Sequence, residues 1–267
     1  MSNFEIVGRN LNAVRERAPL VHNITNFVVM NISANALLAL GASPIMAHAP
    51  EELDELIGIA SALVLNIGTL DAGWIGSMRQ AAIAALARGV PMVLDPVGAG
   101  ASRLRTDTAL ALIEAGRPRI IRGNPSEILA LAGASGTTKG VDSVYGTDAV
   151  EEAARALAKS AGCVVVASGA IDFLTDGERD LHISGGSSLM PRVTGMGCTS
   201  TALIAAFAAV ADSPLDAAVS GMGMMKVAAE LGAEKAIGPG TLQGHFLDAL
   251  HRISQDDLAE RLKIAGE

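Results

Sequence analysis

The residues with the clearest capacity for chemistry lie at 194–201, where the sequence TGMGCTST opens a long apolar stretch. Gly195 and Gly197 would let the backbone approach a ligand closely. The first amide groups of the following helix, with the positive end of its dipole, would form an anion hole for a transferring phosphoryl group. The same glycines also suit a tight turn before a buried helix, so the motif alone leaves both interpretations open.

Two carboxylates follow apolar runs that read as strands. Asp95 ends the run VPMVLD, and Glu127 falls on the first turn of a helix that begins at Pro125. If their strands are neighbours, both groups lie at one edge of the sheet, where they could hold Mg²⁺ directly or through water beside ATP phosphates. Taken singly, Asp95 before a proline could form a turn, and Glu127 could complement a helix dipole.

Two further strand ends carry groups suited to phosphate. Arg122, in RIIRGN, offers a planar and permanently charged fork for phosphate oxygens, although a salt bridge to Asp95 or Glu127 is the alternative. Ser168 follows the run CVVVA and precedes a glycine, so its hydroxyl could reach a phosphate or form an ordinary turn.

The elements that must position these residues alternate between short β-branched runs and longer Ala/Leu-rich segments. This pattern predicts a single α/β domain over residues 1–267, with a central, mostly parallel sheet covered by helices on both faces and ligands outside the carboxyl ends of the strands. Residues 170–184 predict an antiparallel hairpin at a sheet edge. A helix is expected from about 195 to 211, and another from Pro214.

Composition narrows the class of function. The net charge is −8 with scattered basic residues, and aromatic residues make up 3% of the chain, which disfavours a nucleic-acid partner. Mean hydropathy is +0.38, but the most apolar stretch, 193–211, begins with glycine and hydroxyl residues, so we expect no membrane span. The amino terminus lacks a signal-peptide pattern, and the two cysteines, Cys163 and Cys198, form no metal or redox motif. These features predict a cytoplasmic protein.

The motifs together resemble the ribokinase-like superfamily, and within it the hydroxyethylthiazole kinase family over essentially the whole chain. The matching segments are HNITNFVVMN at 22–31, GASPIMAHAPEE at 41–52, NIGTL at 66–70, DPVGAGAS at 95–102, RGNPSEI at 122–128 and TGMGCTSTA at 194–202.

The resemblance implies phosphorylation of the primary alcohol of 5-(2-hydroxyethyl)-4-methylthiazole by ATP with Mg²⁺, in a homotrimer with sites at subunit interfaces. It implies contacts of Met46 and Gly195 with the thiazole, and of Arg122 and Ser168 with ATP. It also places Asn26, Asp95 and Glu127 where the family gathers its phosphate and magnesium groups. A methionine-lined pocket suits a flat, soft heterocycle.

At Cys198 the sequence departs from most ribokinase-like enzymes, which have an aspartate there to accept the proton of the alcohol; the thiazole-kinase branch has cysteine. A thiol is mostly protonated at neutral pH unless a helix terminus lowers its pKa. Since phosphoryl transfer depends mainly on alignment and charge neutralisation, we expect Cys198 to assist catalysis rather than to drive it.

Other functions fit parts of the same pattern. Another branch of the superfamily, such as a hydroxymethylpyrimidine kinase or the nucleotide-dependent dehydratase that repairs hydrated NAD(P)H, would share the anion hole. From a different class, a catalytically silent nucleotide-binding protein would keep the fold, although the intact Asp95, Arg122, Glu127 and glycine-rich turn argue against it.

Overall fold

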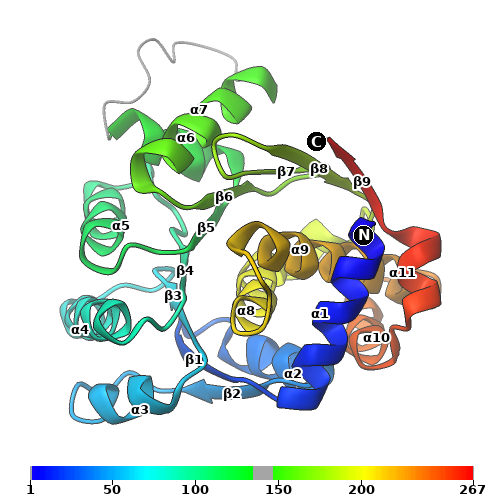
Figure 1. Ribbon diagram of the computed structural model, residues 1–267, viewed down its shortest axis with the longest axis horizontal. Helices are drawn as coiled ribbons and strands as arrows, with labels where there is room; N and C mark the ends of the chain where they lie inside the picture. The colour runs from blue at the N-terminus through cyan, green and yellow to red at the C-terminus, as the bar shows by residue number, and fades with distance from the viewer. Residues whose placement is uncertain (1, 135–146, 267) are drawn as a thin grey trace.

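A nine-stranded sheet forms the centre of the computed structural model, which describes residues 2–134 and 147–266 (Figure 1). Its strands are, in spatial order, β2 (Ser43–Met46), β1 (Leu20–Ile24), β3 (Ala62–Asn66), β4 (Met92–Asp95), β5 (Ile120–Gly123), β6 (Val164–Ala167), β7 (Asp172–Thr175), β8 (Asp180–Ser184) and β9 (Lys263–Gly266).

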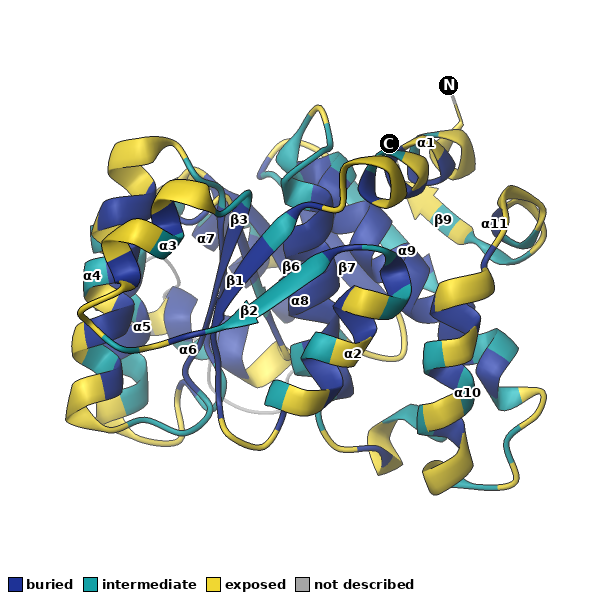
Figure 2. Ribbon diagram, turned by 90° about the horizontal axis from the view of Figure 1, so that it is seen from below, coloured by how far each residue is buried: buried dark blue, intermediate teal, exposed yellow. Residues whose placement is uncertain are grey.

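The first six strands in this order are parallel, and the last three are antiparallel to their neighbours. All residues of β3, β4 and β6 are buried, as continuous apolar strands covered on both faces must be. At one edge of the sheet, β2 is only half-buried along its length (Figure 2). The carboxyl ends of the parallel strands therefore meet at one edge of a buried sheet.

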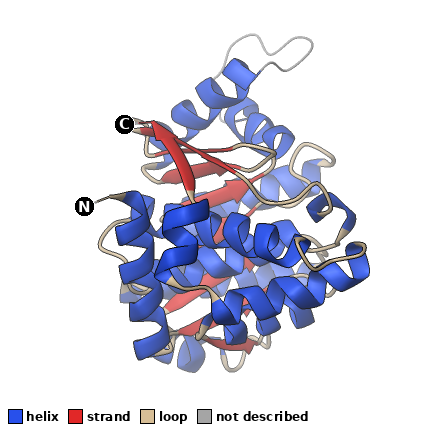
Figure 3. Cartoon of the chain, turned by 90° about the vertical axis from the view of Figure 1, so that its right-hand side faces the viewer, coloured by secondary structure: helices blue, strands red, loops and turns tan. Residues whose placement is uncertain are grey.

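Helices cover both faces of the sheet (Figures 1 and 3). One face packs against α3 (Leu53–Ile59), α4 (Ala72–Arg88), α5 (Arg103–Gly116), α6 (Pro125–Ala134) and α7 (Thr147–Ala161). The other packs against α2 (Met30–Leu40), α8 (Met196–Ala208) and α9 (Pro214–Ala233), and these helices are covered in turn by α1 (Asn3–Arg17), α10 (Pro239–Arg252) and α11 (Gln255–Arg261). The predicted fold class is confirmed.

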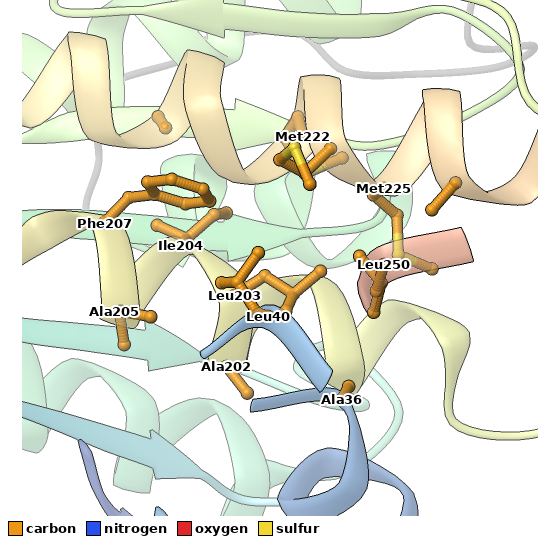
Figure 4. Close-up of a cluster of buried hydrophobic side chains, with 14 of the residues drawn as sticks. Ala36, Leu40, Ala202, Leu203, Ile204, Ala205, Phe207, Met222, Met225 and Leu250 are labelled. Atoms are coloured by element: carbon orange, nitrogen blue, oxygen red, sulfur yellow. The ribbon is translucent and has the colours of Figure 1, made fainter. Parts of the chain in front are cut away.

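The helix that follows the glycine-rich turn, α8, is the centre of the second core. Leu203 and Phe207 of α8 pack with Met222 of α9 and with side chains of α2 and α10 (Figure 4). Both α8 residues are fully buried, and burying a side chain of this size stabilises the fold by about 1.5–3 kcal/mol. The buried packing of these side chains therefore holds the amino end of α8 in a fixed position.

The predicted local elements are present with small changes of boundary. The hairpin expected at 170–184 is formed by β7 and β8, but its predicted place at the sheet edge is wrong, because β9 pairs with the outer side of β8. The helix expected at 195–211 is α8, which begins at Met196 and ends at Ala208. Ser213 caps α9 through its hydroxyl, with Pro214 at the first helical position. In the described part of the chain no helix is both long and apolar enough to cross a membrane. The pairing of residues 263–266 as a ninth strand was not predicted from the sequence.

Candidate active site

Asp95 lies at the centre of a buried polar network at the carboxyl ends of the strands. Its Oδ2 accepts hydrogen bonds from Asn66 Nδ2 and from the hydroxyl of Thr201, each at 2.8 Å. Parallel pairing of β3 with β4 sets Asn66 beside Asp95, and Thr201 comes from α8. Burial raises the pKa of Asp95 to about 6, although the nearby charge of Arg122 opposes the shift. The Oδ1 atom of Asp95 is buried and has no protein hydrogen-bond partner.

Cys198 joins this network through Asn26. The Nδ2 of Asn26 donates to Asn66 Oδ1 at 2.8 Å and lies 3.7 Å from the sulfur of Cys198. Asn26 therefore contacts protein groups on both sides, and it links the thiol to Asp95 through Asn66.

The pKa of Cys198 is raised to about 11, chiefly by burial and then by the charge of Asp95. The sequence allowed for the opposite shift, because a helix terminus can lower the pKa of a thiol. Cys198 does lie in the first turn of α8, but its burial and the charge of Asp95 keep the thiol protonated at neutral pH.

The glycine-rich turn needs its two glycines for different reasons. Gly195 is the N-cap of α8 with a φ of 83°, in the left-handed region that favours glycine. A Cβ atom at Gly197 would lie 2.7 Å from Nη1 and 2.8 Å from Nη2 of Arg122. The guanidinium of Arg122 therefore packs directly against the start of the helix, where an anion would bind.

Arg122 is held from two sides. Its Nη2 donates a hydrogen bond to the hydroxyl of Ser168, and Nη1 lies 3.8 Å from Asp95 Oδ2. The hydroxyl of Ser168 in turn donates to the carbonyl of Gly123 at 3.2 Å. The arginine side chain is 12% exposed. The structure thus brings Arg122, Ser168 and Asp95 together, as their positions at strand ends predict.

Glu127 uses both carboxylate oxygens on backbone amides. Oε2 accepts from the amide of Asn124 at 2.7 Å and Oε1 from the amide of Gly98 at 2.8 Å, while the Asn124 side chain accepts from the Glu127 amide at 2.9 Å. This is a capping box at the start of α6, and it also ties α6 to the loop after β4. Within residues 2–134 and 147–266, no three His, Cys, Asp or Glu side chains are grouped as a metal site.

Met46 ends the edge strand β2 and is half-buried. Its Cα pairs with that of Asn23 on β1. Met46 therefore lies on the same side of the sheet as the residues above, at the carboxyl ends of the parallel strands. Two positions after Met46, His48 stacks on Trp74 with ring centroids 4.0 Å apart, and the ring centroid of Phe27 lies 4.6 Å from that of the same indole.

A cavity of about 770 Å³ opens in front of the anion hole. Its lining includes Arg122, Ser168, Gly195 and Gly197, and also Lys226. Lys226 and its buried partner Asp172 were not identified as site residues from the sequence. Lys226 Nζ lies 3.2 Å from Asp172 Oδ2. The available signal was a lone lysine inside the apolar run of α9.

Arg105 is a second residue that the sequence did not reveal. It donates to the carbonyl oxygens of Ile67 at 3.0 Å, Gly68 at 2.9 Å and Val97 at 2.6 Å. These carbonyls belong to the loops after β3 and β4, so Arg105 fixes the relative positions of two loops at the functional edge of the sheet.

A family model described as the hydroxyethylthiazole kinase family matches residues 11–256. The chain belongs to the hydroxyethylthiazole kinase family. A hydroxyethylthiazole kinase of Nitratidesulfovibrio vulgaris is 60% identical over 264 residues, which cover 99% of each chain. The family predicted from the motifs is confirmed, and the chain is a kinase.

Solved structures agree with this membership. The hydroxyethylthiazole kinase protein of Pyrococcus horikoshii OT3 superposes with a TM-score of 0.93 at 44% identity, covering 98% of this chain and 99% of that one. A pyridoxal kinase from Staphylococcus aureus, solved with AMP-PCP and pyridoxal, matches with a TM-score of 0.62 at 16% identity over 93% of this chain and 98% of that one. This second likeness shows a shared ribokinase-like fold.

Proposed function

We propose that this chain, as one domain over residues 1–267, transfers the terminal phosphoryl group of ATP to the primary alcohol of 5-(2-hydroxyethyl)-4-methylthiazole in the cytoplasm, as a step of thiamine salvage. Membership of the hydroxyethylthiazole kinase family supports the substrate. The assignment of the phosphate site is supported by the packing of Arg122 against Gly197 at the amino end of α8, beside a cavity of about 770 Å³. This arrangement places a fixed positive charge and free helix amides at one point.

In this proposal the cavity in front of α8 takes ATP. Arg122, Ser168 and Asn26 are assigned to the nucleotide, and the amides after Gly195 and Gly197 form the anion hole. Because Arg122 is already anchored by Ser168, its charge needs no reorganisation when the phosphoryl group moves. Preorganised groups of this kind supply most of the stabilisation in phosphoryl transfer.

The site contains a carboxylate that could bind Mg²⁺, that of Asp95. Its buried Oδ1 has no protein partner, and carboxylate oxygens are the ligands that Mg²⁺ prefers. Glu127 fits less directly, because both of its oxygens already accept backbone amide protons, so we assign it to the metal site through bridging water. When bound, Mg²⁺ would neutralise phosphate charge.

The alcohol would meet the thiol of Cys198 as a neutral group. With a thiol pKa of about 11, Cys198 orients the hydroxyl by hydrogen bonding and does not remove its proton before transfer. The new O–P bond forms as the bond between the terminal phosphorus and ADP breaks, and the alcohol proton passes to an oxygen of the transferred phosphoryl group and from there to solvent. A loose transition state needs little help from a base, so the network of Cys198, Asn26 and Asp95 acts mainly by alignment.

The thiazole ring is assigned to Met46 and Gly195, in a homotrimer whose sites lie at subunit interfaces. Support comes from the position of Met46 on the half-buried edge strand β2 and from the apolar side chains of Phe27 and Val28, which follow the neighbouring strand β1 in the chain and are 61% and 62% exposed in the single chain. Apolar groups this exposed favour a protein interface.

The test is ADP formation from ATP and Mg²⁺ with a panel of acceptors: the hydroxyethylthiazole, a hydroxymethylpyrimidine, hydrated NADH, and no acceptor. We expect turnover with the thiazole to exceed that with the others by orders of magnitude and to stop in excess chelator. Preference for the pyrimidine or the hydrated dinucleotide would assign the chain to another activity of the fold, and no turnover with any acceptor would indicate a silent binding protein.

A further inference from the structure

Lys226 is a charged residue buried inside an otherwise apolar helix. It lies in α9 and is 4% exposed. Its Nζ donates to the carbonyl oxygens of Gly169 at 2.8 Å and Ala170 at 3.1 Å, and it lies 3.2 Å from Asp172 Oδ2. Burying an ammonium group is costly unless it is paired and hydrogen-bonded. Here every partner lies within residues 168–172, which comprise the connection from β6 to β7 and the first residue of β7, Asp172.

Asp172 holds the same connection from its other side. Its Oδ1 accepts a hydrogen bond from the amide of Gly169 at 2.9 Å, and the residue is 1% exposed. Burial raises the pKa of Asp172, and the charges of Lys226 and Arg122 oppose that shift. The connection is therefore clamped between a buried cation and a buried carboxylate.

This connection leads directly to the anion hole. It begins at Ser168, whose hydroxyl accepts a hydrogen bond from Arg122. A short path of contacts therefore runs from Lys226, through the carbonyls that it binds, to Ser168 and the guanidinium beside Gly197.

The aliphatic part of Lys226 supports a second wall of the cavity. A Cβ atom at Gly186 would lie 3.3 Å from Lys226 Cδ, and one at Gly185 would lie 3.8 Å from its Cβ. Both glycines line the cavity with Lys226. One side chain thus supports two loops that face the same space.

We propose that Lys226 is a positioning residue for the nucleotide: its ammonium fixes the 168–172 connection, and through Ser168 it orients Arg122 toward the phosphates. The inference rests on the proposed function, since it takes the cavity as the ATP site. It adds a residue from α9, outside the strand-end motifs, to the groups on which ATP binding depends.

The test compares Lys226→Met with the double variant K226M/D172N. Methionine keeps the aliphatic stem but loses the charge, which leaves Asp172 buried and unpaired, so the single variant is expected to be poorly stable. The double variant removes that charge while an asparagine oxygen can still accept from the Gly169 amide. The matched control is Ser220→Ala, which breaks the buried hydrogen bond of Asn10 to Ser220 in the same helix but away from the cavity.

For each folded variant, kcat and the KM of each substrate are measured together with the midpoint of thermal unfolding. We expect the double variant to unfold near the wild-type temperature and to show a KM for ATP raised about tenfold, the scale of lost charge-assisted hydrogen bonds, with the KM for the alcohol unchanged. Ser220→Ala should lower the unfolding temperature and leave both KM values unchanged.

A double variant with the wild-type KM for ATP overturns the inference. So does a double variant in which both KM values rise together, since that pattern reports a general structural role. If the wild-type protein neither binds ATP nor forms ADP with the alcohol, the proposed function itself fails, and this inference fails with it.

Discussion

At the scale of single residues, the protonation of Cys198 decides how the alcohol can be activated. Its burial and the neighbouring charge of Asp95 raise the thiol pKa to about 11, so at pH 7 the thiolate fraction is very small. The thiol lies 3.7 Å from Asn26 Nδ2, a contact that fixes its direction. These properties indicate that Cys198 orients the substrate and does not act as a general base.

We therefore expect Cys198→Ala to reduce kcat by less than about tenfold, well below the 10²–10⁴-fold typical of general-base catalysis. Single-turnover rates on folded protein measure this, with Cys198→Ser as the matched control because a hydroxyl keeps the size and the hydrogen-bonding capacity. A loss of a thousandfold in the alanine variant, unrelieved by serine, would mean that the sulfur has a chemical role of its own.

Asp95 gives a second residue-scale prediction, in the pH dependence of stability. Its folded pKa of about 6 lies above the ordinary value of 3.8, so the folded state binds the proton more tightly than the unfolded chain. The stability that this provides is fully present below about pH 4 and is lost as the pH rises to 6 and above. At 1.36 kcal/mol per pKa unit, the loss is about 3 kcal/mol.

Asp95→Asn should remove this pH dependence. An amide oxygen can accept from Asn66 and Thr201 as Oδ2 does now, so we expect the variant to be more stable than wild type above pH 6 and nearly inactive as a kinase. Denaturant unfolding of both proteins from pH 4 to 8 measures the difference. Parallel curves for the two proteins across that range would show that Asp95 does not titrate there.

The sequence could predict much of this site because its residues follow strands. Asp95, Arg122 and Ser168 come where apolar runs stop, and parallel pairing brings such positions to one edge. The pKa of Cys198 could not be predicted, because it depends on burial and on Asp95, which lies 103 positions away in the chain. The capping box of Asn124 and Glu127 was readable in NPSE, but the second hydrogen bond of Glu127, to Gly98, requires the fold.

At the scale of elements, the two glycines of the turn before α8 allow two effects of a substitution to be measured separately: a loss of stability and a loss of ATP affinity. A methyl group at Gly197 would meet only the flexible end of Arg122, at 2.7 Å, whereas one at Gly195 would meet Val29 Cγ1 at 2.8 Å on a backbone with a φ of 83°. The first clash can be relieved by moving the guanidinium. The second adds a conformational cost of roughly 1–3 kcal/mol.

Gly197→Ala should accordingly keep most of the stability and lose affinity for ATP, because Arg122 is displaced from the anion hole. Gly195→Ala, its matched partner two residues earlier, should lower the free energy of unfolding. Thermal unfolding and the KM for ATP are measured for both variants. Equal losses of stability in the two, with an unchanged KM for ATP in Gly197→Ala, would contradict the packing of Arg122 against the helix start.

At the scale of the whole molecule, the sheet of the single chain ends in two unpaired edge strands, β2 and β9. The strand β2 is half-buried, and Phe27, Val28 and Leu38 expose 61%, 62% and 60% of their surface in the adjoining β1–α2 segment. The other edge strand, β9, is exposed at three of its four residues, but it carries none of the residues assigned to the site. The β2 edge carries Met46, the residue assigned to the thiazole, which is why the proposed trimer and the proposed substrate site are linked.

We expect the protein to behave in solution as a trimer of its 27.2 kDa chain, and we expect Val28→Glu to dissociate it, since an unpaired carboxylate in an apolar interface costs several kcal/mol. Ile83→Glu, on the outer face of α4 and 51% exposed, is the matched control and should leave the trimer intact. Light scattering at micromolar concentration reports the mass, and thiazole-dependent ADP formation reports the site. If the sites need two subunits, activity should fall with the trimer in Val28→Glu and persist in Ile83→Glu. A monomeric wild-type protein with full activity would refute both the trimer and the interfacial site, because the pocket around Met46 would then be complete within one chain.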